Sequence, residues 1–226
     1  MRVIEWLLDA DPSVRWQVMR DLTSEPADVI AAERARVATE GLGAQLLALQ
    51  APDGHWGGRP WSLDYTDTFH ALELLRRLGL DPQSDQAQRA IGLVREHVVW
   101  RGGAPVETPW SDHRFFEGEV EPCINGNVVA TGSYFGVDME PLVERLLGEQ
   151  LPDGGWNCEV ENGATVSSFA TTINVVEGHR DPDGQWPLQN VHAGEAPVHL
   201  DEGEGRPSRW NTLRAMRVLA WYGKGG

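Results

Sequence analysis

The sequence has little cysteine, little positive charge and no long apolar run. Two cysteines in 226 residues cannot build a disulfide framework, so we expect a reducing, cytoplasmic location. Only 19 Lys and Arg stand against 34 Asp and Glu, and a net charge of -15 disfavours nucleic acid and anionic lipid as partners. No apolar stretch approaches the roughly 18 residues of a membrane span, and Glu5 and Asp9 interrupt the N-terminal one. The sequence therefore predicts a soluble protein without a transmembrane segment or a secretory signal.

Tryptophan is abundant, with ten in the chain, and three of these residues end the same short motif. Residues 50–56 read QAPDGHW, residues 150–156 read QLPDGGW, and residues 181–186 read DPDGQW, a degraded third copy. Pro-Asp-Gly is a strong turn signal. Each copy is followed by a run of helical spacing with Thr or Ser near its start, which suits an N-terminal cap. The repetition predicts stacked helix-turn-helix units that bury one another's apolar faces.

The expected elements are all helices, which makes the predicted fold class all-α. The N-terminal 40 residues are expected to form three helices and a helical cap, followed by a repeat domain over residues 41–226. The predicted helices cover Val3–Leu8, Pro12–Leu22, Ala27–Thr39, Leu42–Leu49, Thr68–Gly79, Asn127–Gly136, Ser168–Gly178 and the run from Asn211 onward. Gly79 suits a helix C-cap, because glycine adopts the left-handed conformation without steric cost.

The motif Gln-x-Pro-Asp-Gly-x-Trp at residues 50–56 and 150–156 resembles the repeat of squalene-hopene cyclases and related triterpene cyclases. It is also similar to the Gly-rich turns of protein prenyltransferase β subunits. The resemblance spans roughly residues 40–222 and is weakest between 85 and 125. It implies an α/α toroid, in which outer helices surround inner helices around a central cavity. The third motif begins only three residues after Gly178, so we expect an incomplete or shortened ring, or one closed by self-association.

The same resemblance points to acids near the start of an inner helix. Triterpene cyclases carry Asp-x-Asp-Asp-Thr, and residues 64–68 here read DYTDT. Thr66 stands where that family has its proton donor, and a threonine cannot protonate an alkene at neutral pH. Asp64 and Asp67 remain candidate catalytic acids or ligands of a diphosphate-bound Mg²⁺, with Glu159 as a third acid. The alternative is that these aspartates cap the helix that follows them.

Protein prenyltransferases hold a zinc ion with an Asp, a Cys and a His. By that resemblance Cys123, Cys158 and His113 are candidate zinc ligands, since thiolate and imidazole suit zinc. The spacing contains no Cys-x-x-Cys or His-x-x-x-His pair, and the alternative is that the cysteines are small buried side chains. Candidate contacts to an isoprenoid come from residues that would line the cavity: His70, Trp110, Arg209 and Trp210.

The sequence thus predicts a terpenoid cyclase-like or prenyltransferase-like protein that acts on or binds an isoprenoid in an aromatic-lined cavity. Zinc or magnesium would be its cofactor. The alternative is a non-catalytic helical-repeat module that binds an apolar ligand or a protein partner. For the motif tryptophans, the simplest explanation is that Trp56, Trp156 and Trp186 each pin their turn against the next helix.

Overall fold

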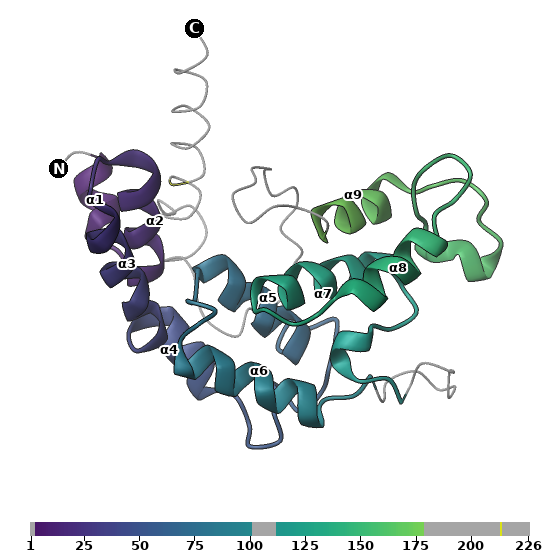
Figure 1. Ribbon diagram of the computed structural model, residues 1–226, viewed down its shortest axis with the longest axis horizontal. Coiled ribbons are helices and arrows are strands. Elements are labelled where there is room, and N and C mark those ends of the chain that lie inside the picture. Colours follow the sequence, from purple (N-terminus) through teal and green to yellow (C-terminus); the bar gives the residue numbers. More distant parts are fainter. Residues whose placement is uncertain (1–2, 101–111, 179–212, 214–226) are drawn as a thin grey trace, which may run out of the picture.

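The computed structural model describes residues 3–100, 112–178 and 213 (Figure 1). Within these residues the fold is all-α, as predicted; the only β pairing is two isolated bridges, Trp56 with Arg59 and Val99 with Arg114. The α-helices are α1 Val3–Leu8, α2 Pro12–Leu22, α3 Ala27–Ala35, α4 Gly41–Ala48, α5 Thr68–Leu78, α6 Asp85–His97, α7 Pro122–Tyr134, α8 Glu140–Gly148 and α9 Phe169–Gly178. Three 3₁₀ helices join them: η1 Arg36–Ala38, η2 Phe115–Glu117 and η3 Cys158–Asn162. No helix in the described part of the chain is long and apolar enough to cross a membrane.

The N-terminal helices form at the predicted residues and pack on the rest of the molecule. Asp11 caps α2 by accepting from the backbone N–H of Ser13 at 2.9 Å, and its other oxygen accepts from Leu42 N at 2.8 Å. Trp16 Nε1 donates to the carbonyl of Leu78 at 2.9 Å, at the end of α5. These contacts place α1–α3 on the same hydrophobic core as the later helices. A domain boundary at residue 40 stays a prediction.

The end of α5 shows why glycine is required at position 79. Gly79 has φ of 82°, and a Cβ there would lie 2.1 Å from Trp16 Cζ2. The guanidinium groups of Arg20 and Arg34 lie over the Trp16 ring, and Arg34 also donates to the Gly79 carbonyl at 2.9 Å. The indole therefore rests directly on the C-cap backbone of α5, which fixes where the N-terminal helices dock.

The two complete motifs form the same hydrogen-bonded corner. Trp56 Nε1 donates to the carbonyl of Leu46 at 2.7 Å, and Trp156 Nε1 donates to that of Leu146 at 2.7 Å. Gln50 Nε2 bonds Gly54 O at 3.1 Å, as Gln150 Nε2 bonds Gly154 O at 2.8 Å. The two corner glycines are both left-handed, and both tryptophans are buried. Each of these two tryptophans pins its turn, but the prediction of the next helix was wrong for the indole bond, because the carbonyl that accepts it belongs to the preceding helix.

The corners differ in how they join the next helix. Trp56 N donates to the hydroxyl of Thr68 at 3.1 Å, at the first residue of α5. Trp156 N donates to Thr172 at 3.0 Å, which lies later in α9 because that helix begins at Phe169. Both helices thus begin about twelve residues after their tryptophan, but the threonine that accepts from the tryptophan N–H is Thr68 in one repeat and Thr172, not Ser168, in the other. The third motif and the run from Asn211 lie outside the described residues, apart from Leu213, which is helical and buried.

Helices α7 and α9 run in the same direction. Near their starts, Cys123 of α7 and Thr171 of α9 both contact Cys158. Farther along, Gly126 of α7 touches the α9 backbone, where an added Cβ would lie 2.5 Å from Asn174 O. At the other end, Tyr134 OH donates to Leu80 O at 2.7 Å, which joins the C-terminal ends of α7 and α5. Helices α4 and α8 pack against α5 and α7, and the described elements follow one another along a curved layer (Figure 1).

Candidate functional site

Asp67 is the N-cap of α5 and is fully buried. Its Oδ1 accepts from His70 N at 3.0 Å, and its Oδ2 accepts from the Ser62 backbone N–H at 2.9 Å and from the His70 ring at 2.7 Å. The Ser62 hydroxyl lies between Asp67 and Asp64 and has one proton for the two carboxylates. The capping alternative is therefore confirmed for Asp67, whose two oxygens are engaged by these donors.

Asp64 is exposed and ionised. The Ser62 hydroxyl, the Thr66 hydroxyl and backbone N–H, and the charge of Arg59 lower the pKa of Asp64 to about 2. Thr66, at the position of the proton donor in triterpene cyclases, donates its hydroxyl to Asp64 at 2.8 Å. A carboxyl group that releases its proton so readily is a poor acid for protonating an alkene.

His70 has three aromatic neighbours and a fixed ring. The ring centroids of Tyr65 and Phe69 lie 4.5 Å and 4.9 Å from that of His70, and Trp61 lies at 6.5 Å. The bond from Nδ1 to Asp67 orients the imidazole. Tyr65 has φ of 61°, a conformation uncommon for a residue with a side chain. The contact of His70 with an isoprenoid stays a prediction.

Cys123 and Cys158 meet, although 35 positions separate them in the chain. Cys123 lies in the first turn of α7, and Cys158 opens η3 just after the second motif corner. Their Sγ atoms are 2.9 Å apart, and the Cys123 thiol donates to Glu121 Oε2 at 3.5 Å. One ligand atom from each of Glu121, Cys123 and Cys158 lies within 4.8 Å of the others.

The surroundings shift the pKa values of the two thiols in opposite directions. The hydrogen bond with Cys123 and the Thr171 hydroxyl lower the pKa of Cys158 to about 7. The contact with Cys158, burial and the carboxylate of Glu121 raise the pKa of Cys123. Cys158 is therefore the thiol of the pair that ionises first, which makes its sulfur the stronger nucleophile and metal ligand.

Glu119 was missed by the sequence reasoning, although it stands close to Cys123 in the segment EVEPC. Burial raises the pKa of Glu119 to about 7, and its Oε1 accepts from Glu121 N at 2.6 Å. The fully buried side chain of Asn125 bonds the Glu119 backbone on both sides, N–H and carbonyl, at 2.8 Å each. These bonds hold the segment that carries Glu121 against α7. Two acids shortly before Cys123, with Pro122 as a helix-start signal between them and the cysteine, were the available signal.

The other predicted site residues do not join this cluster. His113 is not part of the three-residue group; its carbonyl accepts from Trp100 N at 2.9 Å. Glu159 is exposed in η3, and its carboxylate accepts from Asn162 Nδ2 at 2.6 Å. Trp110, Arg209 and Trp210 lie outside the described residues.

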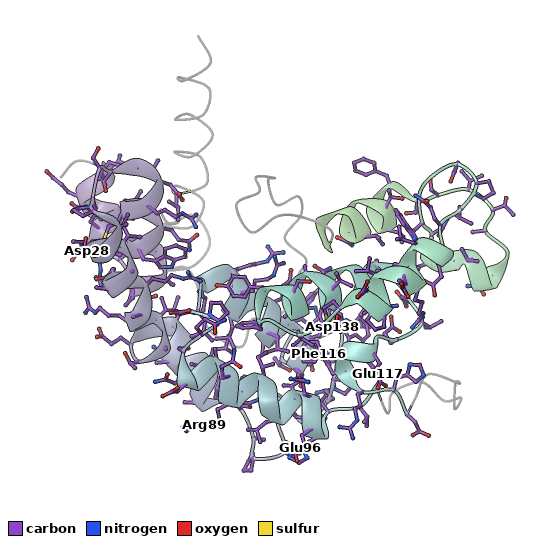
Figure 2. All side chains as sticks on the ribbon, in the orientation of Figure 1. Asp28, Arg89, Glu96, Phe116, Glu117 and Asp138 are labelled. Carbon is purple, nitrogen blue, oxygen red and sulfur yellow. The ribbon has the colours of Figure 1, made fainter. Side chains whose placement is uncertain are left out.

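A surface cavity of about 530 Å³ lies between α6, η2 and α8. Figure 2 labels four of its lining residues, Glu96, Phe116, Glu117 and Asp138, and Phe116 is its single aromatic residue. Arg114 at its edge donates to the carbonyls of Arg95 and Glu96, at the end of α6. The lining is charged, unlike the aromatic-lined cavity expected from the sequence, and that central cavity stays a prediction.

Comparison with known proteins returns no match. No protein-family model, no curated protein and no solved structure matches the chain. The expected resemblance to cyclases and prenyltransferases rests on the repeat motif of the sequence.

Proposed function

We propose that this protein is a helical-repeat protein of the α/α-toroid type that binds an isoprenoid-like molecule beside a metal–thiolate centre. In this proposal it is closer to protein prenyltransferases than to triterpene cyclases. The observation that carries the proposal is the convergence of Glu121, Cys123 and Cys158 where α7 and α9 begin.

Two features support the toroid. Helices α7 and α9 run parallel and α5 meets α7 at their C-terminal ends, an arrangement that suits inner helices of a toroid. The complete motif corners lead from α4 into α5 and from α8 into α9. The corner thus turns an outer helix into an inner helix at both places.

The donor set fits zinc. Two sulfurs and one carboxylate oxygen are ligands that zinc accepts, and three protein ligands with a fourth open position are typical of catalytic zinc sites. Magnesium fits poorly, because it prefers oxygen ligands and the carboxylate of Asp67 is already engaged by its donors. A zinc ion held by these three residues would activate a bound thiol or water by stabilising its anion.

The chain's own residues prepare this centre. Cys158 supplies a thiolate because Cys123 and Thr171 bond its sulfur. Glu119 and Asn125 fix the backbone before Glu121, so that this carboxylate does not have to be ordered when a ligand arrives. The buried carboxyl of Glu119 adds an acid next to the thiols.

The DYTDT segment at residues 64–68 has no carboxyl group suited to protonate an alkene, as a cyclase requires. Asp64 is an exposed anion, and Asp67 is a helix cap. The same observation favours the second candidate, a non-catalytic module that binds an isoprenoid without turnover. The two candidates differ only in whether the metal-loaded protein converts its ligand.

Titration with Co²⁺ tests the centre. Reduced wild-type protein should bind one Co²⁺ and develop near-ultraviolet sulfur-to-cobalt absorption, while Cys123→Ser, Cys158→Ser and Glu121→Gln weaken binding by at least about tenfold. Glu117→Gln, an acid outside the cluster, serves as the matched control. Unchanged binding in all three cluster variants would refute the centre.

Ligand binding and turnover are measured on the same protein. Farnesyl diphosphate should quench tryptophan fluorescence, and with a small thiol as acceptor the zinc-loaded enzyme should yield a thioether detectable by mass spectrometry. Quenching without product would leave the non-catalytic module. If farnesyl diphosphate and farnesol both failed to quench, isoprenoid binding would be excluded.

A further inference from the structure

The contact between Cys123 and Cys158 is closer than packing alone requires. Their sulfurs lie 2.9 Å apart, and both residues are half-buried free cysteines. A disulfide bond is about 2.05 Å long, so a further approach of roughly 0.9 Å would form the bond. Partial exposure leaves a route by which a small oxidant can reach them.

We propose that Cys123 and Cys158 are a reversible redox pair that low-molecular-mass disulfides such as oxidised glutathione convert to an intramolecular disulfide. Closing the bond would remove two of the three ligands of the centre, so oxidation would release the metal. The thiol chemistry stands on the sulfur contact alone, whereas the release of metal rests on the proposed function.

The reaction proceeds by two thiol–disulfide exchanges. The thiolate of Cys158 attacks one sulfur of oxidised glutathione, the glutathione S–S bond breaks, and one glutathione leaves as a thiolate that takes up a proton. Cys123, after losing its proton to solvent, attacks Cys158 Sγ and displaces the second glutathione thiolate, which is protonated in turn. Two protein thiols are oxidised by two electrons, and one oxidised glutathione becomes two reduced molecules.

The surroundings assign the order of the two steps. Cys158 Sγ accepts from the Thr171 hydroxyl at 3.5 Å, which stabilises its anion. Cys123 donates its proton toward Glu121 at 3.5 Å, which keeps it a thiol until the mixed disulfide has formed. Cys158 is therefore the attacking residue and Cys123 the resolving one.

The bond would also join two repeat units. Cys123 belongs to the start of α7, while Cys158 follows the Trp156 corner that leads from α8 to α9. Since α7 and α9 already touch at Gly126, the oxidised form needs no large rearrangement of the helices.

Redox titration tests the proposal. Metal-free full-length protein is equilibrated in buffers of reduced and oxidised glutathione, quenched with acid, alkylated with N-ethylmaleimide and weighed by mass spectrometry. Wild type should pass in one two-electron transition from two alkylated cysteines to none, without a bound glutathione. Cys123→Ser should accumulate a glutathione adduct on Cys158, and Cys158→Ser should react at least about tenfold more slowly.

Two outcomes would overturn the redox pair: wild-type protein that keeps both thiols at every glutathione ratio, or wild-type protein that accumulates glutathione on both cysteines. Glu121→Gln separates the two proposals, because it should lose Co²⁺ binding and still form the disulfide. If the wild type formed the disulfide but its reduced form did not bind Co²⁺, the proposed metal centre would be refuted and the redox pair would stand. If the reduced wild type bound Co²⁺ but never formed the disulfide, only the redox pair would be refuted.

Discussion

The indole nitrogen of Trp56 lies 2.7 Å from the carbonyl oxygen of Leu46, to which it donates a hydrogen bond. Trp156 repeats this bond with Leu146 at the same distance. Both tryptophans are buried, and the backbone N–H of each donates to a threonine of the helix after the corner. A pair of residues ten positions apart thus defines the repeat unit.

Trp56→Ala and Trp156→Ala should each lower the free energy of unfolding by about 3–5 kcal/mol, because a large buried ring is removed. Trp56→Phe and Trp156→Phe should cost about 1–2 kcal/mol less than the alanine variants, since they keep an aromatic ring. Urea unfolding followed by circular dichroism measures all four. A corner that lost less than about 1 kcal/mol on replacement by alanine would not be holding the helices together.

Gly79→Ala should be much more damaging than Gly136→Ala. Both glycines end helices with positive φ, so each alanine pays roughly 1 kcal/mol for the left-handed backbone. At Gly79 the added methyl also meets the ring of Trp16 at 2.1 Å, whereas nothing lies within 4 Å at Gly136. We expect the difference in melting temperature to exceed about 5 °C, and equal shifts would mean that Trp16 does not rest on this C-cap.

Asp67→Asn should destabilise the fold by about 1–3 kcal/mol, because at least one donor from Ser62 or His70 loses its acceptor. Asp64→Asn, on the exposed side of the same loop, should stay within about 0.5 kcal/mol of wild type. Thermal melts compare the two. If Asp67→Asn left stability unchanged, the assignment of Asp67 as a helix cap would be wrong, and Asp67 would again be a candidate catalytic acid.

The stability of the protein should fall as the pH rises above 10, in part through Tyr134. Burial raises the pKa of Tyr134 above its ordinary value of 10.0, so the unfolded chain releases this proton first. The stabilisation is complete below pH 10 and disappears as the pH passes through the folded-state pKa. Wild type should therefore lose more stability than Tyr134→Phe between pH 9 and about 11.5 in urea titrations, and parallel losses would contradict this.

Much of the helical framework could be predicted because its signals are local. Pro12 at the start of α2 and Gly79 after α5 mark helix ends by their own backbone preferences. The corners follow from Pro-Asp-Gly and a tryptophan within one short motif. By contrast, α6 had no clear signal in the weak part of the repeat, and α7 begins at Pro122, before the predicted Asn127.

The site could be predicted only in part because its residues come from distant segments. The two cysteines were named by residue type, and the structure brings them together through the packing of α7 on α9. His113 was named for its type as well, whereas the third group that arrives is Glu121, two positions before Cys123. The residue type of Asp67 alone does not tell whether it is a catalytic acid or a helix N-cap. That difference depends on the hydrogen bonds it receives from Ser62 and His70.

The close contact at Gly126 sets the distance between the two helices next to the thiol cluster. Because α7 meets α9 at a residue without a side chain, peptide backbones in direct contact set the spacing of the two helices. Substitutions of larger core residues elsewhere in the fold should then leave the distance between the sulfurs of Cys123 and Cys158 unchanged. A bulkier residue at this position would act as a wedge, spreading the ends of the helices and the sulfurs with them.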